Sequence, residues 1–217
     1  MQENKSTLQY LVKEPKVQNE KTRTLILLHG VGSNEQDLFN LSAYLPEDIR
    51  IISARAPITL GNNSYAWYQV DFSTGKPVYN PQQEQSSRKA IIYFIGEIKS
   101  KYKLSTDQLY LGGFSQGAIM SYSVALTNPH LVAGIIVMSG RLPEEIKPSV
   151  APKEKLKNLE VFMSHGTKDN VLPVAYARDA NQFLKSLDIE TTYNEYPEGH
   201  GINAQMLADL NKWFNRK

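Results

Sequence analysis

The chain of 217 residues has no cysteine, almost no net charge and no long apolar run. Without cysteine it cannot form disulfides, bind metals through thiolates or use a cysteine nucleophile. Its 24 Lys and Arg residues nearly balance 22 Asp and Glu residues. No basic run interleaved with aromatic residues occurs, so we expect no nucleic-acid partner. No stretch approaches the roughly 18 apolar residues of a membrane span, and the first residues lack an apolar signal core. These absences predict a cytoplasmic protein without stable membrane insertion.

The composition that is present, 41% hydrophobic and 21% charged, is typical of a globular protein. The length suits one domain over residues 1–217, with little chain left for a large lid domain. Residues 1–21 form a polar N-terminal segment with a possible edge strand at 8–12. Further strands are predicted at 24–28, 49–54, 109–114, 133–138, 159–164 and 191–196, and helices at 35–44, 82–102, 118–126, 174–187 and 202–214. This alternation predicts an α/β fold with a mainly parallel central sheet and helices on both faces.

A Gly-x-Ser-x-Gly pattern follows the apolar run at 109–114 and leads into a predicted helix. It reads Gly113-Phe114-Ser115-Gln116-Gly117. A sharp strand-to-helix turn of this kind strains the central serine and presents its hydroxyl, so Ser115 is the candidate nucleophile. The Gln116 N–H, free at the start of the helix, can face a developing oxyanion. The alternative is a glycine-rich turn whose serine merely caps the helix.

A glycine-rich loop, His29-Gly30-Val31-Gly32-Ser33-Asn34, follows the predicted strand at 24–28. Such a loop lets backbone N–H groups face a ligand, and Val31 is the candidate for a second oxyanion donor. A phosphate-binding loop is disfavoured because the required spacing and lysine are missing.

A serine hydroxyl needs an imidazole to accept its proton and a carboxylate to orient that imidazole. In the α/β-hydrolase arrangement these residues follow the serine in the order acid, then histidine, each after a strand. Asp169 follows the predicted strand at 159–164, and His200 follows the one at 191–196. We therefore predict that Asp169 and His200 serve Ser115.

The remaining candidates fit other roles better. His29 is expected to shape its loop, His130 to lie on the surface and His165 to be a structural residue at a strand end. The other carboxylates considered lie on or at the ends of predicted helices; they are Asp179, Asp188 and Asp209.

The segment between residues 55 and 81 is the longest predicted loop, because prolines and glycines punctuate it throughout. Its aromatic residues can form a substrate wall beside the site, although Trp67 can equally pack in the core. The candidate substrate-binding residues are Trp67, Tyr68, Leu142 and Leu172.

Four segments carry a family resemblance: Phe114-Ser115-Gln116-Gly117-Ala118, the Leu28-His29-Gly30 loop, Asp169-Asn170-Val171 and Gly199-His200. Through them the chain resembles the phospholipase/carboxylesterase family of α/β-hydrolases. That family includes acyl-protein thioesterases and bacterial carboxylesterases. The resemblance covers about residues 22–215, and Gly30-Val31-Gly32-Ser33-Asn34 is similar to the bacterial branch. It implies a Ser115, Asp169 and His200 triad, an oxyanion hole at Val31 and Gln116, and hydrolysis without a cofactor or metal.

The sequence therefore predicts a serine hydrolase that cleaves small-molecule carboxylic esters of small to medium acyl chain through an acyl-enzyme. Within the same class, an acyl-thioesterase or a lysophospholipase is the alternative. From another class, the alternative is a non-catalytic protein that keeps the fold and binds a ligand. A homodimer that covers an apolar rim near the site is compatible with the sequence.

Overall fold

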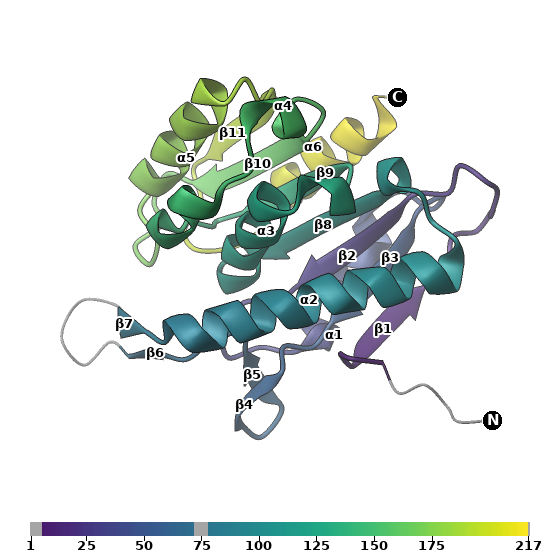
Figure 1. Cartoon of the computed structure of the whole chain (residues 1–217), viewed down its shortest axis with the longest axis horizontal. Coiled ribbons are helices and arrows are strands. Elements are labelled where there is room, and N and C mark those ends of the chain that lie inside the picture. Colours follow the sequence, from purple (N-terminus) through teal and green to yellow (C-terminus); the bar gives the residue numbers. More distant parts are fainter. Residues whose placement is uncertain (1–5, 72–77, 217) are drawn as a thin grey trace.

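The computed structural model of the chain describes residues 6–71 and 78–216. Its centre is a seven-stranded sheet with the order β1-β3-β2-β8-β9-β10-β11 (Figure 1). The strands of this sheet are β1 (Tyr10–Lys13), β2 (Thr24–Leu28), β3 (Arg50–Ala54), β8 (Leu109–Phe114), β9 (Gly134–Met138), β10 (Glu160–Gly166) and β11 (Thr191–Tyr196). Only β1 runs antiparallel to its neighbour, so the predicted mainly parallel sheet is confirmed.

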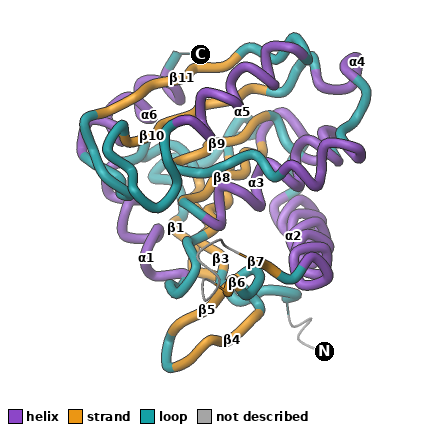
Figure 2. Tube along the Cα trace, turned by 90° about the vertical axis from the view of Figure 1, so that its left-hand side faces the viewer, coloured by secondary structure: helices purple, strands orange, loops and turns teal. Residues whose placement is uncertain are grey.

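Helices cover both faces of the sheet, as predicted. The α-helices are α1 (Glu35–Phe39), α2 (Pro81–Tyr102), α3 (Gln116–Thr127), α4 (Lys153–Leu156), α5 (Ala175–Ser186) and α6 (Ala204–Asn215). The 3-10 helices are η1 (Asn40–Tyr44), η2 (Thr106–Gln108), η3 (Pro129–Leu131) and η4 (Glu144–Ser149). Figure 2 shows α1 and α6 on one side of the sheet, with α2 and α3 on the other. None of the helices in the described ranges is long and apolar enough to span a lipid bilayer.

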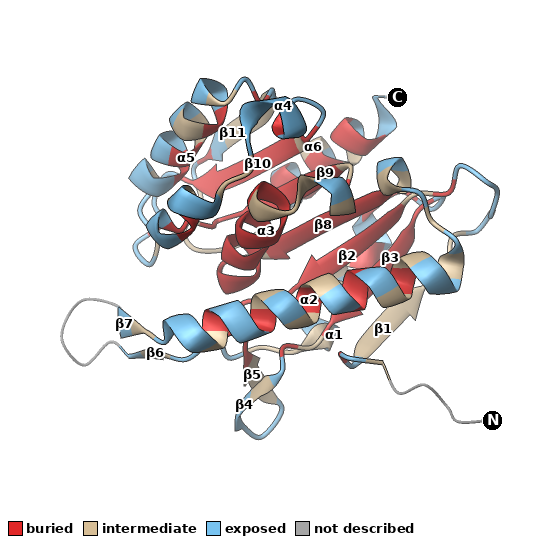
Figure 3. Ribbon diagram, in the orientation of Figure 1, coloured by how far each residue is buried: buried red, intermediate tan, exposed pale blue. Residues whose placement is uncertain are grey.

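Each face of the sheet has its own apolar core. One core joins the sheet to α2, α3 and α5 through residues such as Leu111 and Ile95. The other joins it to α1 and α6 through residues such as Tyr110 and Trp213. Every residue of β2, β3 and β9 is buried, which explains why these strands are mostly apolar rather than alternating. In Figure 3 the central strands are accordingly buried, and the outer surface of α2 is exposed.

The predicted absence of regular structure between residues 55 and 81 is wrong. Two hairpins lie there, built from β4 (Ile58–Gly61) with β5 (Ser64–Ala66) and β6 (Val70–Asp71) with β7 (Val78–Tyr79). The glycine and asparagines that suggested a loop form the first hairpin's turn, where Asn63 has a φ of 53°. Part of the predicted loop, residues 72–77, lies outside the described residues.

Several element ends differ from the predictions by one or two residues, and two elements differ in a way that matters for the site. The predicted helix at 35–44 ends as an α-helix at Phe39 and continues as the 3-10 helix η1. The strand predicted at 159–164 extends to Gly166, because His165 and Gly166 still pair with β11. His165 is therefore part of the sheet.

Candidate active site

The turn between β8 and α3 holds Ser115 in a strained conformation. Ser115 has a φ of 53° and a ψ of −116°, a region that side-chain-bearing residues rarely occupy. The turn is tight enough that a Cβ atom on Gly117 would lie 1.8 Å from the Leu28 carbonyl oxygen. The Ser115 N–H donates to the Met138 carbonyl of β9 at 3.0 Å, which anchors the turn to the sheet. The glycines thus allow the backbone of β2 to approach the turn.

The structure brings Ser115, His200 and Asp169 into one hydrogen-bonded chain. His200 Nε2 lies 2.9 Å from Ser115 Oγ, and His200 Nδ1 lies 2.7 Å from Asp169 Oδ2. A carboxylate accepts hydrogen bonds, so Nδ1 carries a proton and, in neutral imidazole, Nε2 is free to accept one from the serine. The arrangement can therefore deprotonate Ser115 as it attacks.

Asp169 is held from both of its oxygens. Oδ1 accepts hydrogen bonds from the Val171 and Leu172 N–H groups at 2.9 and 2.8 Å. His165 Nε2 lies 2.7 Å from the Leu172 carbonyl oxygen and 3.4 Å from Asp169 Oδ2. Because a carbonyl only accepts, Nε2 of His165 carries a proton, which also faces the carboxylate. The sequence marked His165 as structural, and its contacts secure the loop that carries Asp169.

The glycine-rich loop after β2 lies directly beside Ser115. A Cβ atom on Gly30 would lie 3.5 Å from Ser115 Cβ. In the described part of the chain, neither the Val31 N–H nor the Gln116 N–H donates a hydrogen bond to the protein. Both amides are therefore available to an oxygen held near Ser115 Oγ.

His29 supports this loop from the interior. Its Nε2 accepts the Ala56 N–H at 3.0 Å, so the proton lies on Nδ1, which donates to the Gly30 carbonyl at 2.7 Å. Burial lowers the pKa of His29, although the hydrogen bond to Gly30 opposes that shift. His29 is thus a neutral structural group.

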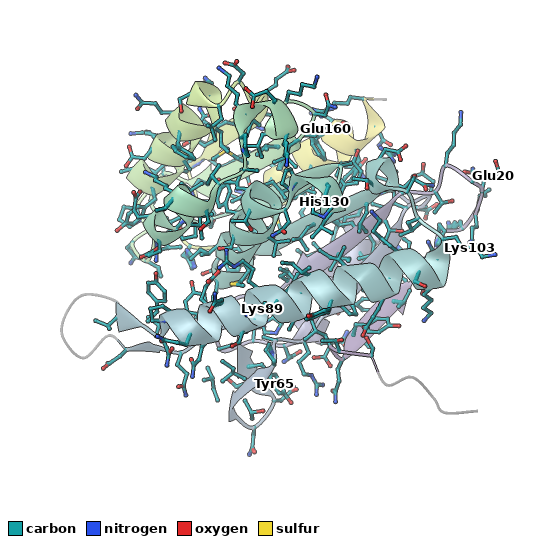
Figure 4. All side chains as sticks on the ribbon, viewed as in Figure 1. Glu20, Tyr65, Lys89, Lys103, His130 and Glu160 are labelled. Atoms are coloured by element: carbon teal, nitrogen blue, oxygen red, sulfur yellow. The ribbon has the colours of Figure 1, made fainter. Side chains whose placement is uncertain are left out.

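The β4–β5 hairpin also holds the glycine-rich loop, a role that sequence reasoning missed. The Gly32 N–H donates to the Tyr65 carbonyl, and the Tyr65 N–H donates to the Ser33 carbonyl, both at 2.9 Å. Tyr65, labelled in Figure 4, lies at this hairpin. The two strands of this hairpin are short and flank a glycine and two asparagines, so the sequence has no periodic pattern there. The pairing of Tyr65 with the glycine-rich loop could therefore not be predicted.

Gln116 has a second contact that the sequence did not reveal. Its side-chain oxygen accepts the Trp67 N–H at 2.8 Å, and its side-chain nitrogen donates to the Tyr68 carbonyl at 2.7 Å. The Trp67 indole N–H donates to the His29 carbonyl at 3.0 Å. The residue that offers an oxyanion donor therefore also connects the segment after β5 to the turn.

The four candidate substrate-binding residues differ in exposure. Trp67 is wholly buried in the core, which agrees with the core-packing alternative rather than with an exposed wall surface. Tyr68 and Leu142 are buried at 3% and 6% relative exposure, and Leu172 is partly exposed. Tyr68 lines the hollow described below.

The other candidates lie apart from this chain of hydrogen bonds. His130 is exposed in η3, as predicted. Asp179 lies exposed on α5, Asp188 pairs with Lys153, and Asp209 on α6 accepts a hydrogen bond from Tyr196. Within residues 6–71 and 78–216, no three or more His, Asp or Glu side chains are placed to hold a metal ion.

Known proteins resemble this chain over nearly its whole length. Acyl-protein thioesterase 1 of Mycosarcoma maydis is 27% identical, and the match covers 94% of this chain and 95% of that protein. Lysophospholipase-like protein 1 of Mus musculus is 28% identical over 88% of this chain and 85% of its own length.

Among solved structures, the Bacillus cereus carboxylesterase matches with a TM-score of 0.83 at 20% identity, covering 96% of this chain and 94% of that one. The likeness confirms the α/β-hydrolase fold, and no large lid domain is present among the described elements. Residues 10–216 match the Phospholipase/Carboxylesterase family. The chain therefore belongs to the phospholipase/carboxylesterase family.

Proposed function

We propose that the protein hydrolyses small-molecule carboxylic esters through an acyl-enzyme on Ser115. The observation that supports this most strongly is the continuous hydrogen-bonded chain from Ser115 Oγ through His200 to Asp169. The family assignment supports ester-bond chemistry, and the geometry supports these particular residues for it.

In the proposed reaction, Ser115 Oγ attacks the ester carbonyl while His200 Nε2 accepts its proton. His200 then protonates the departing alcohol, which leaves an acyl group on Ser115. Water attacks this acyl group, again with His200 as base, and releases the acid. Asp169 keeps the proton of the imidazole on Nδ1 throughout.

The Val31 and Gln116 amides are the proposed oxyanion donors. They are backbone groups fixed before the reaction, so they stabilise the developing charge without reorganising. The Gln116 amide also lies at the N-terminal end of the twelve-residue helix α3, where the helix dipole favours a negative charge.

The test is hydrolysis of p-nitrophenyl acetate by the wild type and by Ser115→Ala. We expect the variant to lose all serine-dependent turnover while keeping its far-UV circular dichroism. Ser186→Ala is the matched control, because Ser186 is exposed at the end of α5 and its hydroxyl donates to the nearby Phe183 carbonyl of the same helix. Equal activity of Ser115→Ala and Ser186→Ala would overturn the assignment.

An acyl-thioesterase is the second candidate, because relatives named acyl-protein thioesterase match most of the chain. The same residues would cleave a thioester, since only the leaving atom changes. Parallel assays with p-nitrophenyl esters and acyl-coenzyme A thioesters of equal acyl length separate the two. A higher kcat/KM for thioesters would favour this second candidate.

A further inference from the structure

A charged hollow of about 250 Å³ lies one helical turn from Ser115. Ile119 of α3 lines it, and the Ile119 N–H donates a hydrogen bond to the Ser115 carbonyl at 3.1 Å. Tyr68, whose carbonyl is bonded by the Gln116 side chain, lines another wall. The hollow is thus built on the same turn that carries the nucleophile.

The walls carry two cations and two anions. Arg88 and Glu84 come from the first turns of α2, and Arg141 and Glu145 from the segment after β9. Each side chain of the Arg88–Glu84 pair is more than four-fifths buried, at 19% and 12% exposure. Charged groups this far from water are costly unless they are paired or hydrogen-bonded.

Their mutual pairing is loose. Arg88 Nε lies 3.6 Å from Glu84 Oε1, and Arg141 Nη1 lies 3.8 Å from Glu145 Oε2. Both distances exceed those of charge-assisted hydrogen bonds. Glu84 is nine-tenths buried, and its Oε1 has no hydrogen-bond partner in the described structure. Neither guanidinium donates a hydrogen bond to a described residue, so donors and an acceptor remain for a ligand.

Two tyrosines complete the lining. The rings of Tyr68 and Tyr79 lie 5.4 Å apart, and the Arg141 guanidinium lies 5.8 Å from the Tyr79 ring centre. Aromatic surface beside planar guanidinium and carboxylate groups suits a ring with an apolar face and hydroxyl edges. An alkyl chain would instead desolvate the four charges without replacing their hydrogen bonds.

We propose that this hollow receives a neutral, polyhydroxylated ring of the ester, of the kind found in acylated sugars. The assignment rests on the proposed function. A hydroxyl both donates and accepts, so it can satisfy a carboxylate and a guanidinium together. An anionic group only accepts, so it could pair with the guanidiniums but would leave the buried Glu84 Oε1 without a donor. Because hydrogen bonds to charged groups are among the stronger ones, we expect a preference of about tenfold or more in kcat/KM.

The test uses two ester pairs matched in ring size. The first compares methyl glucoside acetylated on its primary hydroxyl with cyclohexylmethyl acetate. The second compares the p-nitrophenyl esters of quinic acid and cyclohexanecarboxylic acid, which puts the ring on the acyl side. Rates are divided by those of hydroxide hydrolysis. We expect the hydroxylated member to be preferred in at least one pair, and no preference in either pair would overturn the proposal.

Two variants and one inhibitor locate the preference. Arg141→Gln and Glu84→Gln should reduce the kcat/KM ratio of the preferred pair severalfold. Glu144→Gln is the control, because Glu144 is exposed beside the hollow, does not line it and pairs with Lys147. It should leave the ratio unchanged. In the wild type, methyl glucoside should inhibit p-nitrophenyl acetate hydrolysis competitively, more strongly than methoxycyclohexane.

The outcomes separate this proposal from the proposed function. Serine-dependent p-nitrophenyl acetate hydrolysis without a hydroxyl preference would overturn the hollow's assignment alone. A preference for the hydroxylated esters that persists in both Arg141→Gln and Glu84→Gln would also overturn the hollow's assignment. So would a higher kcat/KM for p-nitrophenyl hemisuccinate than for either hydroxylated ester. If the folded wild type showed no Ser115-dependent hydrolysis of any of these esters, the proposed function itself would be contradicted.

Discussion

Asp169 shows how single atoms fix the direction of the proposed proton transfer. Its Oδ1 accepts two backbone N–H groups, and its Oδ2 faces His200 Nδ1. In Asp169→Asn the amide oxygen must stay with the backbone N–H groups, so the amide NH₂ would face His200. The imidazole would then carry its proton on Nε2, where it cannot accept one from Ser115.

We therefore expect Asp169→Asn to lower kcat by about 10⁴, as seen for such exchanges in serine hydrolases, without unfolding the protein. Ester hydrolysis and circular dichroism measure the two effects. Asp179→Asn, on the exposed side of α5, is the control and should retain full activity. An Asp169→Asn enzyme within tenfold of wild type would contradict the assigned role.

Replacing two helical glycines by alanine should change the stability of the fold in opposite directions. A Cβ on Gly117 would overlap the Leu28 carbonyl, whereas a Cβ on Gly96, in the exposed part of α2, meets nothing within 4 Å. Gly117→Ala should lower the melting temperature sharply or prevent folding. Gly96→Ala should raise the free energy of unfolding by about 1 kcal/mol, because alanine favours helix. Urea unfolding measures both, and a neutral Gly117→Ala would refute the close approach.

At the residue scale, the sequence predicted the side chains that meet at the site but not the groups that support them. Ser115, Asp169 and His200 follow from a local motif and from chain order after strands. The contacts of Gln116 with Trp67 and Tyr68 join segments far apart in the chain, and no local pattern encodes such a contact. Trp67 was ambiguous because a large aromatic suits both a core and a wall.

At the scale of elements, an ion pair joins α1 to the segment after β3. Arg55 Nε donates to Glu35 Oε2 at 2.6 Å, and the Arg55 guanidinium lies 4.6 Å from the centre of the Tyr65 ring. The hydrogen bond from Arg55 holds the pKa of Glu35 below its ordinary value. This cluster therefore supports the hairpin that holds the glycine-rich loop.

Because the folded pKa of Glu35 is lowered, its ionised form stabilises the fold above the ordinary pKa, and that stability is lost as the pH falls through the lowered value. Glu35→Gln should thus reduce the free energy of unfolding by about 1 kcal/mol near neutral pH, and the difference should vanish in acid. Urea unfolding across pH measures this. Glu47→Gln, in an exposed pair with Lys16, is the control and should change nothing measurable. A pH-independent difference would rule out the ionic explanation.

The elements predicted best are those with long, uniform signals. Strands β2, β8 and β11 begin and end where the sequence predicted, because apolar or β-branched runs are bounded by glycine, proline or polar residues. The hairpins after β3 were missed because their strands are as short as two residues. The β4–β5 hairpin is also held by backbone hydrogen bonds between Tyr65 and the glycine-rich loop, which lies about 30 residues earlier in the chain.

On the scale of the whole molecule, the two cores share the strands of one sheet. Within β8, Tyr110 belongs to one core and Leu111 to the other. Melting either core would expose a face of the same strands, so we expect residues 1–217 to unfold as one cooperative unit. Differential scanning calorimetry should give one transition with calorimetric and van't Hoff enthalpies equal. Two resolved transitions would show separate domains.

The sheet and its flanking helices were predictable because alternation of strands and helices constrains topology strongly. The chemistry of the hollow was not, because its charges come from α2 and from the segment after β9. Those segments lie about 50 residues apart in the chain, and only the folded arrangement brings them together in one hollow, a helical turn along α3 from Ser115.

The central claim is that Ser115 is a nucleophile activated by His200, and covalent labelling tests it most directly. The wild type is treated with an alkyl fluorophosphonate and digested, and the modified peptide is identified by mass spectrometry. We expect one adduct per chain, on Ser115, with labelling slowed at least a hundredfold in His200→Gln. A folded protein that takes no label, or takes it on another residue, would contradict the proposed mechanism.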